Sequence, residues 1–131
     1  MSRRQTIDGL LEAARSRIER LAPEAAYLAV AEGALLVDTR CADDRRETGT
    51  IPGSVNVPLS VLFWRLDPAS GSRDPALADL DRPVILICAH GYSSSLAAAS
   101  LLDLGFASVA DVDGGFEAWV AAGLPVLPAE G

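Results

Sequence analysis

The chain contains no lysine, a single histidine and two cysteines, and each scarcity removes a class of function. Because all 11 basic residues are arginine, a Schiff-base lysine and the lysine of a phosphate-binding P-loop are both excluded. One histidine and two cysteines are too few for a four-ligand zinc site built from these residue types, so we expect no metal of that kind. A disulfide scaffold is excluded as well, and 131 residues are enough to bury a core without one.

The chain is also poor in positive charge and in long apolar runs. Its formal net charge is -7 and its arginines are scattered, so we expect no nucleic-acid partner, since affinity for phosphate backbones depends on a basic surface. No stretch approaches the roughly 18 consecutive apolar residues of a membrane span. The N-terminal sequence is charged throughout, unlike a signal peptide. We therefore expect a cytoplasmic protein without membrane association, in which cysteines stay reduced.

Apolar residues at three- and four-residue spacing predict several helices in one continuous domain without repeats. The first is an amphipathic helix over residues 3–21, and Pro23 opens a second helix that stops at Gly33. Further helices are predicted over 60–66, 93–105 and 116–123. The large aromatic residues of these segments are interpreted as core residues that anchor helices to a sheet: Phe63, Trp64, Phe116 and Trp119.

Short, continuous apolar runs alternate with these helices. They predict strands at 34–38 and 84–88. A short strand is also predicted at 107–112, and a shorter extended stretch at 54–57. Residues 68–83 are polar and rich in turn-forming residues, and are interpreted as a surface loop. Two helices thus precede the first predicted strand. The alternation favours an α/β layer fold with a mainly parallel sheet flanked by helices.

Cys88 is the candidate for chemistry, because it ends the most hydrophobic strand and directly precedes a helix. In parallel sheets ligands bind beyond the carboxyl ends of the strands. Backbone N–H groups of the loop and the positive helix end would stabilise a thiolate or an anion there. Gly91 can adopt the unusual dihedral angles of such a loop, and Ser93 or Ser94 can be the N-cap of the helix. The alternative is that Cys88 is a small buried hydrophobic residue.

Five segments in order resemble the rhodanese family of sulfurtransferases, from about Leu21 to Leu127. They are LVDTR at 36–40, GTIPGSVNVP at 49–58, ICAHGYSS at 87–94, LAAASLLDLGF at 96–106 and VDGGFEAW at 112–119. The resemblance implies a three-layer rhodanese-like fold. It also implies an extra N-terminal helical extension over 1–20 and a rhodanese-like domain over 21–128.

The resemblance further implies a reaction in which Cys88 accepts a sulfane sulfur from a small anionic donor such as thiosulfate and forms a persulfide. The sulfur then passes to a thiol or to cyanide, and no cofactor is required. The active-site loop, whose N–H groups would hold the anion, would consist of Cys88, Ala89, His90, Gly91, Tyr92, Ser93 and Ser94.

The loop departs from the family pattern in its charge. Positions that often carry basic residues in enzymes acting on thiosulfate hold Ala89 and Ser93. We therefore expect weak thiosulfate activity unless Arg40, Arg45 or Arg46, which follow the first predicted strand, bind the donor instead. The alternative for each arginine is an ion pair with Asp38, Glu47 or another nearby acid.

Two functions other than catalysis of sulfur transfer can be weighed from the residues of the loop. A binding or sulfur-relay module with negligible turnover is compatible with the same loop. Phosphatases of related fold have a Cys-x5-Arg pattern, in which the arginine binds the oxyanion. The sixth residue after Cys88 is Ser94 instead of arginine, which disfavours phosphoryl transfer.

Three side chains and the oligomeric state also have two interpretations each. His90 either donates to a bound anion or takes a proton in the site, or is an exposed loop residue. Tyr92 either walls the pocket or presents its hydroxyl there, or packs in the core. Cys41 either resolves the persulfide as a disulfide or is an incidental thiol. Nothing in the sequence decides between a monomer and a homodimer.

Overall fold

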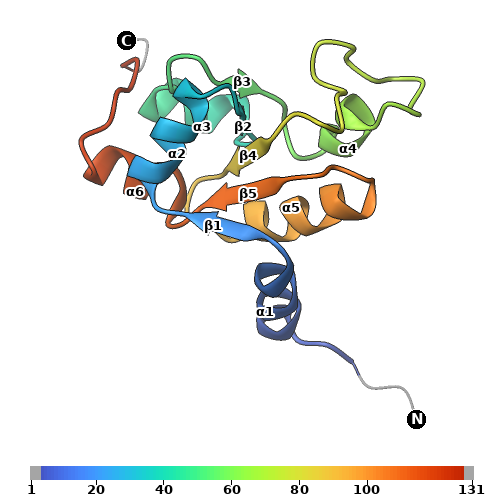
Figure 1. Cartoon of the computed structure of the whole chain (residues 1–131). Helices are drawn as coiled ribbons and strands as arrows, with labels where there is room; N and C mark the ends of the chain where they lie inside the picture. Colours follow the sequence, from blue (N-terminus) through green and yellow to red (C-terminus); the bar gives the residue numbers. More distant parts are fainter. Residues whose placement is uncertain (1–3, 129–131) are drawn as a thin grey trace.

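A parallel five-stranded sheet forms the centre of the protein in this computed structural model, which describes residues 4–128 (Figure 1). The strands follow the order β1-β5-β4-β2-β3, and every neighbouring pair is parallel. Their bounds are β1 Glu19–Leu21, β2 Leu35–Asp38, β3 Val55–Asn56, β4 Val84–Ile87 and β5 Val109–Val112. The expected α/β class with a parallel sheet is confirmed.

Helices cover both faces of this sheet and make three layers. Their bounds are α1 Ile7–Arg17, α2 Pro23–Ala31, α3 Ala42–Thr48, α4 Leu62–Leu66, α5 Ser93–Asp103 and α6 Gly115–Ala121. No helix within residues 4–128 has the length and hydropathy needed to cross a bilayer.

Each face of the sheet contributes side chains to its own cluster of buried residues. Strands β2 and β4 are buried along their whole length, so consecutive residues point into opposite layers. Leu35 and Val37 belong to the cluster that α4 and α5 complete, whereas Leu36 belongs to the cluster that α2 and α6 complete. Helix α1 packs on α5 and so lies outside the layer formed by α4 and α5. Burial on both faces explains why these strands consist of continuous apolar runs.

The prediction of one helix over residues 3–21 is wrong at both ends. Residues 4–6 precede helix α1, which begins at Ile7, and residue 3 lies outside the described residues. Helix α1 stops at Arg17, Ile18 is extended, and Glu19–Leu21 forms strand β1 at the edge of the sheet beside β5. A strand therefore separates α1 from α2. Three residues are too few to show a strand period, and Ile18 and Leu21 happened to fit the helical spacing, so only the pairing with β5 reveals the strand.

Two further features differ from expectation. Helix α3 was not predicted, because none of its residues is buried and it carries no apolar stripe. Trp64 is 59% exposed rather than a core residue, because the short α4 buries Leu62 and Leu66 on its inner side. Phe116 and Trp119 are buried as expected.

Candidate active site

The loop after Cys88 connects β4 to α5 at the carboxyl edge of the parallel sheet. The Cys88 side chain is buried, with 6% of the residue exposed. Its Sγ accepts a hydrogen bond from the Gly91 N–H at 3.1 Å, and the thiol donates to the Ser94 hydroxyl at 3.2 Å. The loop thus folds back over its own first residue.

The environment of the sulfur favours its ionised form. Burial raises the pKa of the Cys88 thiol, but hydrogen bonds from Ser94, Ser93 and the Gly91 backbone lower it by more, so the pKa lies below its ordinary value of 9.0. A thiol of this kind supplies more thiolate near neutral pH than a free cysteine does. The Cys88 site therefore has the chemical character of a nucleophile.

Glycines make the fold of the loop possible. Gly91 has a φ of +86°, which a residue with a side chain adopts only under strain. Gly115 at the start of α6 lies so close beneath the loop that an added Cβ would sit 2.5 Å from the Cys88 carbonyl oxygen. The first backbone N–H groups of α6 donate to that same region, from Phe116 to Cys88 O at 2.7 Å and from Glu117 to Ala89 O at 3.1 Å. Helix α6 therefore holds the beginning of the loop from below.

Neither Ser93 nor Ser94 is the N-cap of the helix, contrary to expectation. The N-cap of α5 is Tyr92, and no side chain makes a capping bond there. Instead the hydroxyls of Ser94 and Ser95 donate to Oδ2 of Asp111 on β5, at 2.8 Å and 2.7 Å. Bonds to a buried carboxylate are charge-assisted and therefore stronger than a bond to a backbone N–H.

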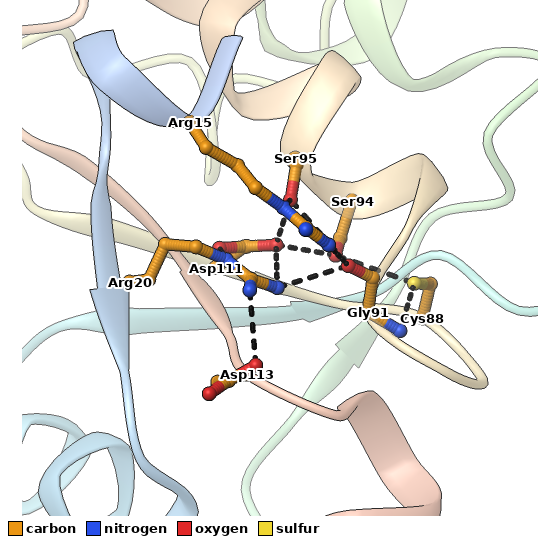
Figure 2. Close-up of polar contacts among 8 residues, drawn as sticks. All are labelled: Arg15, Arg20, Cys88, Gly91, Ser94, Ser95, Asp111 and Asp113. Atoms are coloured by element: carbon orange, nitrogen blue, oxygen red, sulfur yellow. Dashed lines mark hydrogen bonds and ion pairs between the residues drawn. The ribbon is translucent and has the colours of Figure 1, made fainter. Parts of the chain in front are cut away.

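Two arginines complete this arrangement, and sequence reasoning assigned neither to the site. Arg20 on β1 pairs with the buried Asp111, and Arg15 on α1 donates to the Ser95 hydroxyl. Both guanidinium groups also donate to the carbonyl oxygen of Gly91, as Figure 2 shows. These partners lie 71 to 91 positions from the arginines, so no local pattern could have revealed them.

A hollow of about 520 Å³ opens beside the loop. Ala89 and His90 contribute to its wall together with Phe116 and Val120 of α6 and polar residues of α3. His90 is exposed, and its Nδ1 lies 2.9 Å from the Glu117 carboxylate at the rim. A small molecule or a protruding side chain could enter here and reach the start of the loop.

Tyr92 takes neither of the two expected positions. Its side chain is 63% exposed instead of packing in the core, and it is not among the residues lining the hollow. The guanidinium of Arg15 lies over its ring at 5.6 Å. Tyr92 therefore packs towards α1.

Arg40 and Arg45, two of the three arginines suggested for donor binding, have different surroundings. Arg40 borders the hollow but is buried. It forms an ion pair with Asp38 at 2.8 Å, donates to Thr48 and Gly49, and lies 3.7 Å over the Phe116 ring. Arg45 lines two other hollows, neither of which includes a loop residue. The structure therefore brings Arg40 close to the loop with most of its donors occupied, and does not bring Arg45 there.

The two remaining candidates stay on the surface. Arg46 pairs with Asp43 one turn away on α3, in agreement with the ion-pair interpretation. Cys41 is exposed at the start of α3 and is a free thiol, like Cys88. Its role as a resolving thiol stays a hypothesis.

Comparison with known proteins identifies the family of the chain. The family model of the rhodanese-like domain matches residues 22–122. Thiosulfate sulfurtransferase GlpE of Pseudomonas savastanoi pv. phaseolicola (strain 1448A / Race 6) is 42% identical over 106 residues, which cover 81% of this chain and 91% of the relative.

Solved structures show the same likeness. One is a protein of unknown function from Rhodopseudomonas palustris CGA009, described as a possible tyrosine phosphatase. It has a TM-score of 0.88 and 32% identity, with coverage of 97% of this chain and 98% of that one. The polysulfide-sulfur transferase homodimer of Wolinella succinogenes has a TM-score of 0.71 and 26% identity, with coverage of 89% and 83%. This chain belongs to the rhodanese-like family of sulfurtransferases.

Proposed function

We propose that this sulfurtransferase carries sulfur as a persulfide on Cys88. The observation that carries the proposal is the convergence of two hydrogen-bonding groups on one buried sulfur: the Gly91 N–H donates to Sγ at 3.1 Å, and the thiol donates to the Ser94 hydroxyl at 3.2 Å. Together they lower the pKa of a thiol that burial alone would raise. A structural cysteine at the end of a core strand would need no such hydrogen-bonding partners.

The proposed reaction needs no cofactor and no external oxidant. The Cys88 thiolate attacks the outer sulfur of the donor, the sulfur–sulfur bond of the donor breaks, and with thiosulfate the sulfite leaves with the bonding electron pair. A thiolate or cyanide acceptor then attacks the terminal sulfur of the Cys88 persulfide, which restores the Cys88 thiolate. Between the two steps, the N–H groups of residues 89–94 and the Ser93 and Ser94 hydroxyls hold the persulfide anion.

Thiosulfate and polysulfide are the donors to compare, because relatives are named for each. The loop offers no cation to a dianionic donor at positions 89 and 93, and Arg40 is largely occupied by Asp38, Thr48 and Gly49. A missing charge-assisted hydrogen bond costs about 1.5 to 3 kcal/mol. We therefore propose slow turnover of thiosulfate, and faster reaction with a sulfane sulfur that carries less charge.

The acceptor would approach through the hollow beside Ala89 and His90. Its volume of about 520 Å³ suits a small thiol or the tip of a protein segment that bears one. The acidic rim formed by Glu117 would disfavour strongly anionic acceptors.

Phosphoryl transfer is not proposed, although one structural neighbour is described as a possible tyrosine phosphatase. The position that carries the oxyanion-binding arginine in Cys-x5-Arg enzymes holds Ser94, whose hydroxyl binds Asp111. Arg15 and Arg20 do not replace that arginine, because both donate to the Gly91 carbonyl and not to the side of the loop where Cys88 lies.

A cellular setting and a domain organisation belong to the proposal as well. We propose a cytoplasmic protein with free thiols and without nucleic-acid or membrane partners, built of an N-terminal extension over 1–20 and a rhodanese-like domain over 21–128. The homodimer of the Wolinella relative makes a homodimer worth testing beside a monomer.

Intact mass spectrometry tests the proposal. The reduced chain is exposed to thiosulfate, polysulfide or mercaptopyruvate, and the Cys88→Ser variant is compared with Cys41→Ser as the matched cysteine control. We expect wild type and C41S to gain one sulfur atom that cyanide removes, and C88S to gain none. A C88S variant that still gains sulfur refutes the assignment of Cys88. If no donor adds sulfur to the wild type, the chain is a binding module.

A further inference from the structure

A charged cluster lies behind the active-site loop, on the side away from Cys88 (Figure 2). At its centre Asp111 is completely buried and accepts bonds from the Ser94 and Ser95 hydroxyls. Its Oδ1 also accepts from Nε of Arg20 at 3.0 Å. The side chain of Arg20 is only 20% exposed. A cation and hydroxyl donors thus surround this buried carboxylate, as a buried polar group requires.

Gly91 links this cluster to the reactive sulfur. Its carbonyl oxygen accepts from Arg15 at 2.7 Å and from Arg20 at 2.9 Å, while its N–H donates to Cys88 Sγ. The C=O and N–H of one planar trans peptide point in opposite directions. Fixing the Gly91 carbonyl towards the arginines therefore also fixes the direction of the next loop N–H, that of Tyr92. The two guanidinium groups thus set the orientation of the Gly91–Tyr92 peptide group, next to the Gly91 N–H that contacts the sulfur.

Both arginines come from outside the segment that the family model matches. That match begins at residue 22, whereas Arg15 lies on α1 and Arg20 on β1. Helix α1 packs along α5, and the Arg15 guanidinium lies over the Tyr92 ring of the loop. The N-terminal segment is therefore in direct contact with the active-site loop.

We propose that Arg15 and Arg20 are positioning residues of the Cys88 site, acting through Asp111 and Gly91. When the thiol gives its proton to solvent, it no longer needs the Ser94 hydroxyl as an acceptor. The Ser94 O–H then turns from Asp111 to the new thiolate, and no covalent bond changes in this movement. Arg20 and Ser95 keep the charge of Asp111 satisfied while it gives up the Ser94 bond. The inference rests on the proposed function, since it takes Cys88 as the nucleophile.

Without Arg20 the same carboxylate would act against the reaction. An unpaired Asp111 would retain the Ser94 hydroxyl and add an uncompensated negative charge behind the sulfur, and both effects disfavour the thiolate. Removing the charge of Asp111 together with Arg20 would relieve this. The prediction is therefore a specific interaction between two substitutions, which a general loss of packing does not produce.

The charged groups around the loop that could influence the titration of Cys88 come from several elements. Behind the loop they are Arg15, Arg20, Asp111 and Asp113, and beside it they are the exposed pair His90–Glu117 and the buried pair Arg40–Asp38. Substitutions confined to the group behind the loop leave the two pairs beside it intact.

The test measures the rate of Cys88 alkylation by iodoacetamide against pH, in the full chain with Cys41→Ser as background. We expect Arg20→Met to slow alkylation at pH 7 about tenfold or more and to move the profile to higher pH. Arg15→Met should shift it in the same direction by less, and Arg20→Met combined with Asp111→Asn should restore most of the rate. Arg17→Met is the matched control, because Arg17 is on the same helix as Arg15 but binds the exposed Asp103 and not the loop.

Each outcome decides the proposal. Folded R20M and R15M variants with the profile of R17M overturn it, and so does a double variant no better than R20M. Circular dichroism and urea unfolding verify the fold, and if R20M does not fold, R15M and the double variant are decisive. Alkylation reports on the thiol whether or not sulfur moves. If C88S still transfers sulfur, the proposed function fails, while the effect of Arg20 on the thiol is judged independently.

Discussion

Gly115 and Cys88 are in such close contact that a methyl group added to Gly115 would lie 2.5 Å from the Cys88 carbonyl oxygen. Gly115 also has a φ of +64°, a conformation in which a side chain is strained. We expect Gly115→Ala to lower the free energy of unfolding by about 1 to 3 kcal/mol and to lower sulfur transfer further than that loss explains. Urea unfolding and single-turnover rates measure both. Gly71→Ala, in open space, is the control, and an active, stable G115A would contradict the role of this contact.

The Ser94 hydroxyl is expected to control the reactivity of Cys88. It lies 3.2 Å from Sγ and is among the groups that lower the pKa of the thiol against the effect of burial. Ser94→Ala should therefore raise the pKa and slow alkylation at pH 7, as the pH profile would show. Ser100→Ala, which changes an exposed serine of the same helix, should leave the profile unchanged. Equal profiles for both variants would remove Ser94 from the site.

The lowered pKa of Cys88 also predicts how stability varies with pH. The folded state binds the thiol proton less tightly than the unfolded chain, whose thiol titrates near 9.0. The stabilisation is therefore complete above the unfolded value and is lost as the pH falls through the folded value. Urea midpoints of wild type relative to Cys88→Ser should rise with pH across this interval. A constant difference between the two proteins would show that the fold does not perturb the thiol.

Arg40 and Arg45 should differ sharply in their effect on stability. Arg40 is buried against Asp38 with its guanidinium over Phe116, so Arg40→Met leaves a buried carboxylate unpaired at a cost of about 3 to 5 kcal/mol. Arg45→Met should change the free energy of unfolding by no more than about 0.5 kcal/mol. Chemical denaturation checks both variants. If R40M is as stable as wild type but needs more thiosulfate for half-maximal rate, Arg40 is a donor-binding residue instead.

Glu117 places a negative charge at the rim of the hollow, where an anionic donor would enter. Glu117→Gln should raise kcat/KM for thiosulfate about twofold to fivefold at low salt, and the gain should disappear at high salt because the interaction is screened. Glu47→Gln removes the same charge from α3 outside the hollow and serves as the control. Equal gains in both variants would mean that only net charge matters.

Much of this architecture was predictable because its signals are local. Continuous apolar runs indicated β2 and β4, since a strand covered on both faces needs apolar residues throughout. The position of Cys88 between such a strand and a helix indicated the site. Strand β1 and helix α3 were missed for a common reason: one depends on pairing with β5, and the other buries no side chain, so neither leaves a periodic pattern.

The sequence by itself determined the family, the parallel α/β class and the candidate nucleophile, because each follows from local patterns: motif segments, the alternation of strands with helices, and the position of Cys88 after a strand. Only the tertiary structure decided how the loop is held. Arg15 and Arg20 meet Gly91 and Asp111 across 71 to 91 positions of chain, so their pairing arises when β1 joins β5 and α1 packs on α5. Charge pairing over such a separation depends on where the helices and strands lie in the folded protein. The spacing of the residues along the sequence therefore does not predict which charges pair.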